Sequence, residues 1–206
     1  METVEHDGRT TAYRLAGDAA DGPVVLAVHG SGGTHRIWAN QYGPNGCRPF
    51  AAVDLSGHGG SEDTETEPGA ATLDAYVEDV TAVARAVEAD VLVGNSLGGA
   101  VVLTALLDGA VDPAGVVLQG SGAKLAVHED LRALLAGDFE RAIAVLHGPD
   151  MLFHDPDETI LERSKAQLRA TGRAVTERDF LTCHRFDVRD RLHEVDVPAL
   201  AVVGEH

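Results

Sequence analysis

Lysine is almost absent from this chain, and positive charge is scarce overall. The sequence has 16 Lys and Arg residues against 33 Asp and Glu residues, which gives a formal net charge of −17, and its lysines are Lys124 and Lys165. A strongly acidic surface repels phosphate backbones and anionic lipid headgroups. The composition therefore argues against nucleic acids and membranes as partners.

The charge imbalance has two interpretations. An excess of acidic residues with so few lysines resembles the surfaces of salt-adapted cytoplasmic proteins, and an ordinary acidic protein is the alternative. Salt screens the self-repulsion of a highly charged chain. The first interpretation therefore predicts a fold that is more stable in molar salt than in dilute buffer.

Cysteine and long apolar runs are also scarce. The two cysteines, Cys47 and Cys183, lie far apart and form no C-x-x-C motif. We therefore expect both to be free thiols in a reducing compartment, the cytoplasm. No apolar run reaches the roughly 18 residues that a membrane span needs, and the acidic N-terminus METVEHDGRT is unlike a signal peptide.

Strand-like and helix-like patterns alternate through the first part of the 206-residue chain, which is long enough for one sizeable domain. Apolar runs typical of buried parallel strands stand at residues 24–30, 49–54, 90–95 and 114–120. Helical spacing predicts a helix over 73–87, with Thr72 as its N-cap, and a second helix over 97–107. A hairpin signal at residues 6–8 precedes the first run. The alternation predicts a mostly parallel sheet with helices on both faces.

The pattern changes after Gly122. Residues 127–193 show helical spacing without runs of the buried-strand type, which predicts a helical cap inserted between two strands. Residues 197–204, VPALAVVG, return to the strand pattern. We therefore expect a core over 1–122, a helical cap over 123–195 and a return strand of the core in 196–206.

The stretch VLVGNSLGGA, residues 91–100, contains the pattern G-x-S-x-G, with Ser96 between Gly94 and Gly98. Nucleophilic catalysis needs a hydroxyl held clear of the sheet above a helix N-terminus, and small residues on either side let the chain turn that sharply. Here the pattern follows an apolar run and opens a predicted helix. We predict that Ser96 is a nucleophile with a strained, positive φ; an incidental serine in a glycine-rich turn is the alternative.

A second glycine-rich turn, VHGSGG at residues 28–33, follows an earlier predicted strand. An oxyanion hole needs backbone N–H groups aimed at the negative charge that develops during acyl transfer. We expect the N–H groups of Ser31 and Leu97 to form this hole, with Gly32 as a substitute donor; a plain turn is the alternative. We expect His29, at the strand end, to support the loop rather than to act as a base.

These two motifs, together with DLSGHGGSED at residues 54–63, resemble the α/β-hydrolase superfamily in their order and spacing. The likeness extends over essentially the whole chain. It implies an α/β-hydrolase-like fold with an inserted helical cap, a nucleophile at Ser96 and a small-molecule acyl substrate. It also implies that Asp54, His58 and Ser61 hold a loop and take no part in catalysis.

The same resemblance predicts where the catalytic acid and histidine belong. In the family the acid follows the strand that residues 197–204 resemble, and the histidine comes later in the chain. Here Glu205 lies next to the acid position but not on it, and the other family position for the acid reads GSGAK. We therefore expect a fold that lacks its last strand and helix, an edge strand at 197–204 with uncovered apolar surface, and no histidine within hydrogen-bond reach of Ser96 Oγ.

The function that the resemblance implies is hydrolysis of an ester, lactone or similar acyl bond through an acyl-enzyme on Ser96. Loss of the base from such a site costs on the order of 10⁶ in kcat, so we expect the chain to be nearly inactive alone. Acyl transfer, cofactor-free haloperoxidase-like activity and a non-catalytic binding module of the same fold are the alternatives. No motif predicts a metal or another cofactor, and the sequence leaves the substrate and the oligomeric state open.

Overall fold

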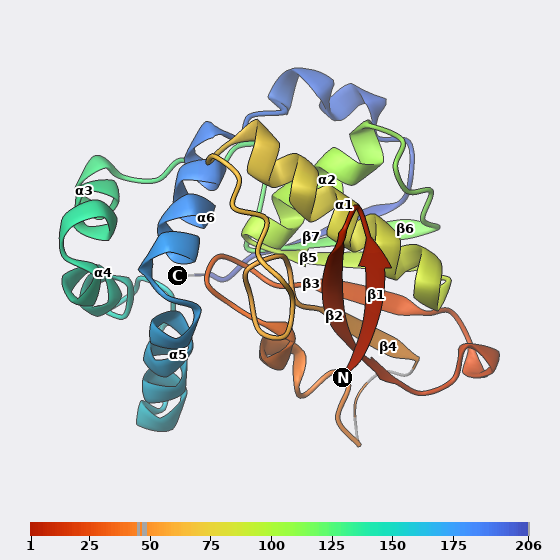
Figure 1. Ribbon diagram of the computed structural model, residues 1–206, viewed down its shortest axis with the longest axis horizontal. Coiled ribbons are helices and arrows are strands. Elements are labelled where there is room, and N and C mark those ends of the chain that lie inside the picture. Colours follow the sequence, from red (N-terminus) through yellow and green to blue (C-terminus); the bar gives the residue numbers. More distant parts are fainter. Residues whose placement is uncertain (45, 47–48, 206) are drawn as a thin grey trace.

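The computed structural model describes residues 1–44, 46 and 49–205 (Figure 1). Cys47, predicted to be a free thiol, lies outside the described residues, as does residue 206. Cys183 is a free cysteine and is buried.

A seven-stranded sheet forms the centre of the molecule, with the strand order β1-β2-β4-β3-β5-β6-β7. β1 and β2 pair antiparallel, β2 pairs antiparallel with β4, and the remaining neighbours are parallel. The mostly parallel sheet predicted from the sequence is thus confirmed. The strands are β1 (Glu2–His6), β2 (Arg9–Ala16), β3 (Val25–Val28), β4 (Phe50–Val53), β5 (Val91–Asn95), β6 (Gly115–Gln119) and β7 (Ala199–Val202).

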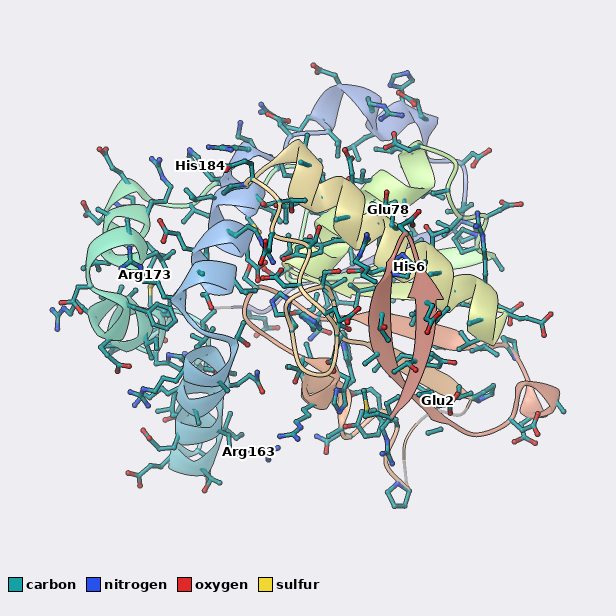
Figure 2. All side chains as sticks on the ribbon, in the orientation of Figure 1. Glu2, His6, Glu78, Arg163, Arg173 and His184 are labelled. Carbon is teal, nitrogen blue, oxygen red and sulfur yellow. The ribbon has the colours of Figure 1, made fainter. Side chains whose placement is uncertain are left out.

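The hairpin predicted at residues 6–8 joins β1 to β2. Asp7 and Gly8 both have positive φ, 46° and 78°, as a two-residue loop of the type that matches strand twist requires. The hairpin lies against the long helix α1 (Ala70–Val87), where His6 Nε2 is 3.2 Å from Asp79 Oδ1 and Arg9 is paired with Glu78. Figure 2 shows His6 and Glu78 where these two elements meet.

Helices α1 and α2 (Leu97–Leu107) cover one face of the sheet. Because side chains alternate along a strand, Leu26 and Val28 of β3 pack toward these helices. Ala27 points to the other face and packs with Trp38 of the short helix η2 (His35–Trp38). A second short helix, η1 (Ala19–Asp21), lies between β2 and β3.

The N-cap predicted for α1 is wrong. The helix begins at Ala70, and its N-cap is Gly69, whose φ of 106° is poorly accessible to other residues. Thr72 lies inside the first turn, where its hydroxyl donates to the carbonyl of Glu67. Thr72 therefore fixes the preceding loop rather than the helix end.

Helices fill the segment between β6 and β7, as predicted. We call α3 to α6 the inserted helices: they are α3 (Glu129–Gly137), α4 (Phe139–Leu146), α5 (Glu158–Thr171) and α6 (Arg173–Arg185), and the short helix η3 (Arg189–Glu194) follows them. Ile143, Leu146 and Leu168 form a small core of their own. α6 lies between α3–α5 and the helices on the sheet, and Arg173 and His184 mark its two ends in Figure 2.

β7 forms one edge of the described sheet, and its apolar side chains are exposed. Leu200 is 57% exposed, and Val203, just after the strand, is 74% exposed. This agrees with the predicted edge strand with uncovered apolar surface. Among the described helices, none has the length and apolarity to cross a membrane.

Candidate active site

Ser96 stands at the junction between β5 and α2, at the edge of the sheet where the parallel strands end. Its φ of 51° and ψ of −114° are strained for a residue with a side chain. The positive φ predicted from the G-x-S-x-G pattern is therefore confirmed. The turn is feasible because residues 94 and 98 are glycines and have no Cβ. A Cβ on Gly94 would overlap the carbonyl of Gly98, and a Cβ on Gly98 would overlap the carbonyl of Val28.

The turn Gly30–Gly33 lies directly beside Ser96. A Cβ on Gly30 would lie 3.1 Å from Ser96 Cβ and 2.8 Å from Asn95 Oδ1, so glycine allows this close approach to Ser96. The N–H of Gly33 donates to the carbonyl of Gly30 at 3.0 Å and closes the turn. The two glycine-rich motifs of the sequence thus meet at one place.

Three backbone N–H groups near this place were predicted as oxyanion donors, and they differ in what they bind. The Gly32 N–H donates to Asp179 Oδ2 at 2.8 Å, so the substitute donor named from the sequence is already occupied. Within the part of the chain that the structure describes, the N–H groups of Ser31 and Leu97 donate to no protein acceptor. These two are therefore free to donate to an oxygen on which negative charge develops.

His29 is buried and both of its ring nitrogens are engaged. Nδ1 donates to the carbonyl of Gly30 at 2.8 Å, and Nε2 accepts from the N–H of Leu55 at 3.1 Å. This pattern requires the neutral imidazole. Burial, together with the neighbouring charge of His58, lowers the pKa of His29 to about 4. His29 supports the loop, as expected, and has no nitrogen available to take a proton from Ser96.

His58 differs from His29 in its protonation, although the centres of the two rings lie only 4.7 Å apart. Both nitrogens of His58 face acceptors: Nδ1 the carbonyl of Ser56 at 3.1 Å, and Nε2 the carboxylate of Asp179 at 2.9 Å. Burial disfavours the imidazolium, but the charge of Asp179 outweighs it and raises the pKa of His58. His58 is therefore a charged, structural histidine.

Asp54 and Ser61 hold the loop between β4 and α1. Asp54 Oδ1 accepts from the N–H of His35 at 2.6 Å, and Ser61 Oγ donates to the carbonyl of Asp54. Burial alone would raise the pKa of Asp54, but the hydrogen bonds from His35 lower it below its usual value. These contacts match the structural roles that the resemblance implied for both residues.

Asp179 is the residue at this site that the sequence analysis missed. It lies on α6 and is fully buried, and its carboxylate accepts from Gly32, His58 and, at 2.7 Å, the hydroxyl of Tyr76. Burial opposes its ionisation, but the charge and hydrogen bond of His58 lower the pKa of Asp179. One signal was present in the sequence: Asp179 shares its helix face with Val175, Thr182 and Cys183, and an acid among such residues calls for buried partners.

The histidines of the inserted segment bond to groups near them. His147 contacts the carbonyl of Ile143 and the hydroxyl of Ser164, and His184 accepts from the N–H of Val127. His154 pairs with Asp150. His193 is exposed on η3. Arg191 of the same short helix pairs with Asp108 at the far end of α2. Asp108 lies about 18 Å from Ser96, at a rise of 1.5 Å per helical residue.

Among the described residues we therefore find no histidine ring bonded to Ser96 Oγ. Glu205, beside the family's acid position, is exposed after β7. No group of three or more His, Cys, Asp or Glu side chains in the described ranges could hold a metal ion. The described site thus holds a strained serine and two unused N–H donors.

Comparisons with known proteins agree with this fold. A family model described as the alpha/beta hydrolase family matches residues 24–206. Among curated proteins, no match was found.

Solved structures of hydrolases are similar to this chain over nearly its whole length. They include a hydrolase from Pseudomonas aeruginosa PA01, with 27% identity and a TM-score of 0.81 over 100% of this chain and 80% of that chain. Est816, an N-acyl homoserine lactone degrading enzyme, has 25% identity and a TM-score of 0.82 over 99% of this chain and 82% of that chain. The enol-lactonase from Burkholderia xenovorans LB400, at 18% identity, has a TM-score of 0.82 over 100% of this chain and 82% of that chain, and it supports the fold alone.

Proposed function

This chain belongs to the alpha/beta hydrolase family, and from that membership we propose that it is a serine hydrolase that cleaves an ester, lactone or similar acyl bond of a small molecule. The observation that carries the proposal is the backbone of Ser96, with φ 51° and ψ −114°. Strain of this kind in a residue other than glycine persists where the surrounding structure imposes it, and it gathers at active sites. This backbone conformation holds the Ser96 hydroxyl above the N-terminus of α2, which is the position of the nucleophile in this family.

Ser96 Oγ attacks the carbonyl carbon of the substrate and forms a tetrahedral intermediate. The N–H groups of Ser31 and Leu97 stabilise its oxyanion, and the positive end of the α2 dipole adds to this. A base takes the proton of the Ser96 hydroxyl during the attack and gives it to the alcohol oxygen as the carbon–oxygen bond to the leaving alcohol breaks, and the acyl group remains on Ser96. Water attacks this acyl-enzyme, releases the acid and regenerates the hydroxyl.

The inserted helices serve in this proposal as a cap over the substrate. They follow β6 directly, and α6 reaches the Gly30–Gly33 turn through Asp179. Est816 degrades N-acyl homoserine lactones, which supports an acyl substrate of that size for this chain. A small, uncharged ester or lactone is therefore the substrate class to test.

A base is the component that the described residues do not supply to Ser96. Without one, acylation should be slower by on the order of 10⁶ than in a complete enzyme of this kind. Free imidazole can replace a missing histidine because it is small enough to reach the hydroxyl. We expect added imidazole to promote acylation of Ser96 by p-nitrophenyl acetate, seen as a burst of p-nitrophenol and as an acetyl group on the peptide that contains Ser96.

The control is Ser96→Ala, which should show only the slow hydrolysis that imidazole catalyses by itself. Acetylation that is spread over other residues, or a burst that survives in Ser96→Ala, would refute Ser96 as the nucleophile. Rapid Ser96-dependent turnover without imidazole would keep the nucleophile and refute the absence of a base.

A non-catalytic binding module of the same fold is the second candidate. It is favoured by one observation, that the ring nitrogens of His29 and His58 are both committed to structural partners. In that case the chain should bind an acyl homoserine lactone in calorimetry, unaltered over hours, and imidazole should add no acyl group to Ser96.

A further inference from the structure

The Gly30–Gly33 turn is held from outside the sheet, by the inserted helices. Its central peptide group joins Ser31 to Gly32, and Gly32 has a φ of +67°. A positive φ at the third residue of a turn closed by a bond from Gly33 to Gly30 is the mark of a type II turn. A type I turn would need the opposite sign of φ at Gly32 and would reverse the direction of the central peptide.

Two of the inserted helices, α5 and α6, contact Gly32 on three sides. Asp179 of α6 accepts from the Gly32 N–H at 2.8 Å, and Thr171 of α5 donates its hydroxyl to the Gly32 carbonyl at 2.9 Å. A Cβ on Gly32 would overlap Leu168 Cδ2 and would lie 3.3 Å from Thr176 Oγ1. The turn is therefore pressed against α5 and α6 without space for rearrangement.

The hydrogen bond from the Gly32 N–H to Asp179 is the stronger of the two hydrogen bonds to Gly32, because its acceptor is charged and buried. Asp179 is fully buried and pairs with His58, so its carboxylate stays ionised and fixed in position. Hydrogen bonds to an ionised acceptor are about twice as strong as neutral ones. Tyr76 of α1 occupies the other carboxylate oxygen, which leaves Asp179 one orientation.

The neighbouring Ser31 N–H is in the opposite condition, since it donates to no acceptor among the described residues and its turn abuts Ser96. Its side chain also touches α6, with Ser31 Oγ 3.6 Å from Cys183 Sγ. We propose that Asp179 is a positioning residue of the hydrolytic site: it holds the Gly32 N–H toward the inserted helices and so keeps the Ser31 N–H free and fixed beside Ser96. This inference rests on the proposed function, because it deepens the account of the same site.

The first measurement is independent of activity. In the ¹H–¹⁵N spectrum of the unsubstituted chain, the Gly32 amide proton should be shifted strongly downfield and protected from exchange by its charged acceptor. In Asp179→Asn the Gly32 signal should move upfield and lose protection, and the Ser31 signal should shift with it. Glu177→Gln removes one carboxylate from the same helix away from the turn, and it should leave both signals in place.

The second measurement is the imidazole-supported acylation of Ser96. Loss of one oxyanion donor costs about 10²–10³-fold in rate in a serine hydrolase. A donor that is displaced rather than deleted should cost less, so Asp179→Asn should slow acylation by about tenfold to a hundredfold. The concentration of ester needed for half-maximal rate should stay the same, because ground-state binding does not use this donor. Glu177→Gln should acylate at the unsubstituted rate.

A milder variant covers the case in which Asp179→Asn does not fold. Thr171→Val keeps the shape of the side chain and removes the hydrogen bond to the Gly32 carbonyl. It should move the Gly32 and Gly33 amide signals and slow acylation in the same direction, by a smaller factor than Asp179→Asn.

The outcomes separate this inference from the proposed function. Unmoved Gly32 and Ser31 signals in folded Asp179→Asn, or moved signals with an unchanged acylation rate, would overturn the positioning role. A protected Gly32 amide in an unsubstituted chain that never acylates Ser96 would overturn the proposed function and, with it, any part for Asp179 in the reaction. Moved signals, slower acylation and an inert Glu177→Gln together would support the inference.

Discussion

Two buried histidines, His29 and His58, have neighbouring rings that differ in charge, the first neutral and the second positive, and their hydrogen-bond partners explain why. His29 faces one acceptor and one donor, so it carries a single proton. His58 faces two acceptors, one of them the carboxylate of Asp179, so it carries two. At the residue scale, each imidazole is a fixed structural part with a set protonation state, and neither is poised to exchange protons with Ser96.

His29 should therefore destabilise the fold in acid. Its pKa is about 4 in the folded chain against 6.5 in the unfolded chain. Between these values the unfolded state binds more protons, so stability falls as the pH drops from 6.5 toward 4. The full interval corresponds to about 3 kcal/mol. Urea unfolding at a series of pH values measures this loss.

The control for this prediction is His29→Asn, whose amide can still donate to the carbonyl of Gly30 but does not titrate. The difference in unfolding free energy between the two chains should shrink steadily as the pH falls from 6.5 to 4. An NMR titration in which the His29 ring protonates near pH 6.5 would contradict the assignment.

Helix α2 approaches strand β3 closely because glycines stand at its start. Gly98 lies against the carbonyl groups of Val28 and His29, and Gly94 lies against the start of the same helix. At the scale of the element, this close approach brings the end of β3 and the N-terminus of α2 together. The Gly30–Gly33 turn and Ser96 become neighbours for that reason.

Gly98→Ala should consequently destabilise the chain. The added Cβ would meet backbone atoms of β3, which cannot move without shifting the sheet, and overpacking of this kind costs about 1–3 kcal/mol. The midpoint of urea unfolding should fall accordingly. Acylation of Ser96 should fall as well, because α2 and its Leu97 N–H would be displaced.

Gly137→Ala is the matched control, since Gly137 ends α3 with no atom within 4 Å of an added Cβ. It should be neutral or stabilising by up to about 1 kcal/mol, because alanine favours the helix. Equal stability of the two variants would mean that α2 does not pack on β3 as closely as described.

The whole molecule carries a net charge of −17, and among the described residues eight Lys and Arg side chains are paired with carboxylates. Arg191 lies between Asp108 and Glu194, and Arg169 is paired with Glu140. Exposed pairs of this kind contribute little to stability. The remaining acidic side chains repel one another, and compaction on folding raises that repulsion.

We therefore expect a higher melting temperature in molar potassium chloride than in dilute buffer, because ions screen this repulsion over about 3 Å at 1 M. The matched control replaces three exposed acids, Asp74→Asn, Asp112→Asn and Asp196→Asn, in one chain. Its net charge is −17 + 3 = −14, so its melting temperature should rise less with salt. A melting temperature of the unsubstituted chain that ignores salt would refute the salt-adapted interpretation.

The sequence by itself determined the parts of this protein that depend on neighbours along the chain. The strand, the sharp turn and the helix around Ser96 follow from an apolar run and two glycines, because steric limits on φ and ψ act within a few residues. The hairpin at Asp7-Gly8 and the helical nature of the inserted segment follow from similar local rules. The N-cap at Thr72 failed because a threonine can serve a loop as well as a helix, and only the position of the Glu67 carbonyl separates the two.

Tertiary structure alone decided which polar groups bind which. The sequence predicted Ser31 as an oxyanion donor and Gly32 as its substitute, and the structure separates the two because Asp179, 147 residues along the chain from Gly32, accepts from the Gly32 N–H. His29 and His58 likewise look alike in the sequence, and their charges differ because one lies beside an N–H and the other beside a carboxylate. A buried polar group must find a partner, and packing over the whole chain determines which partner is within reach.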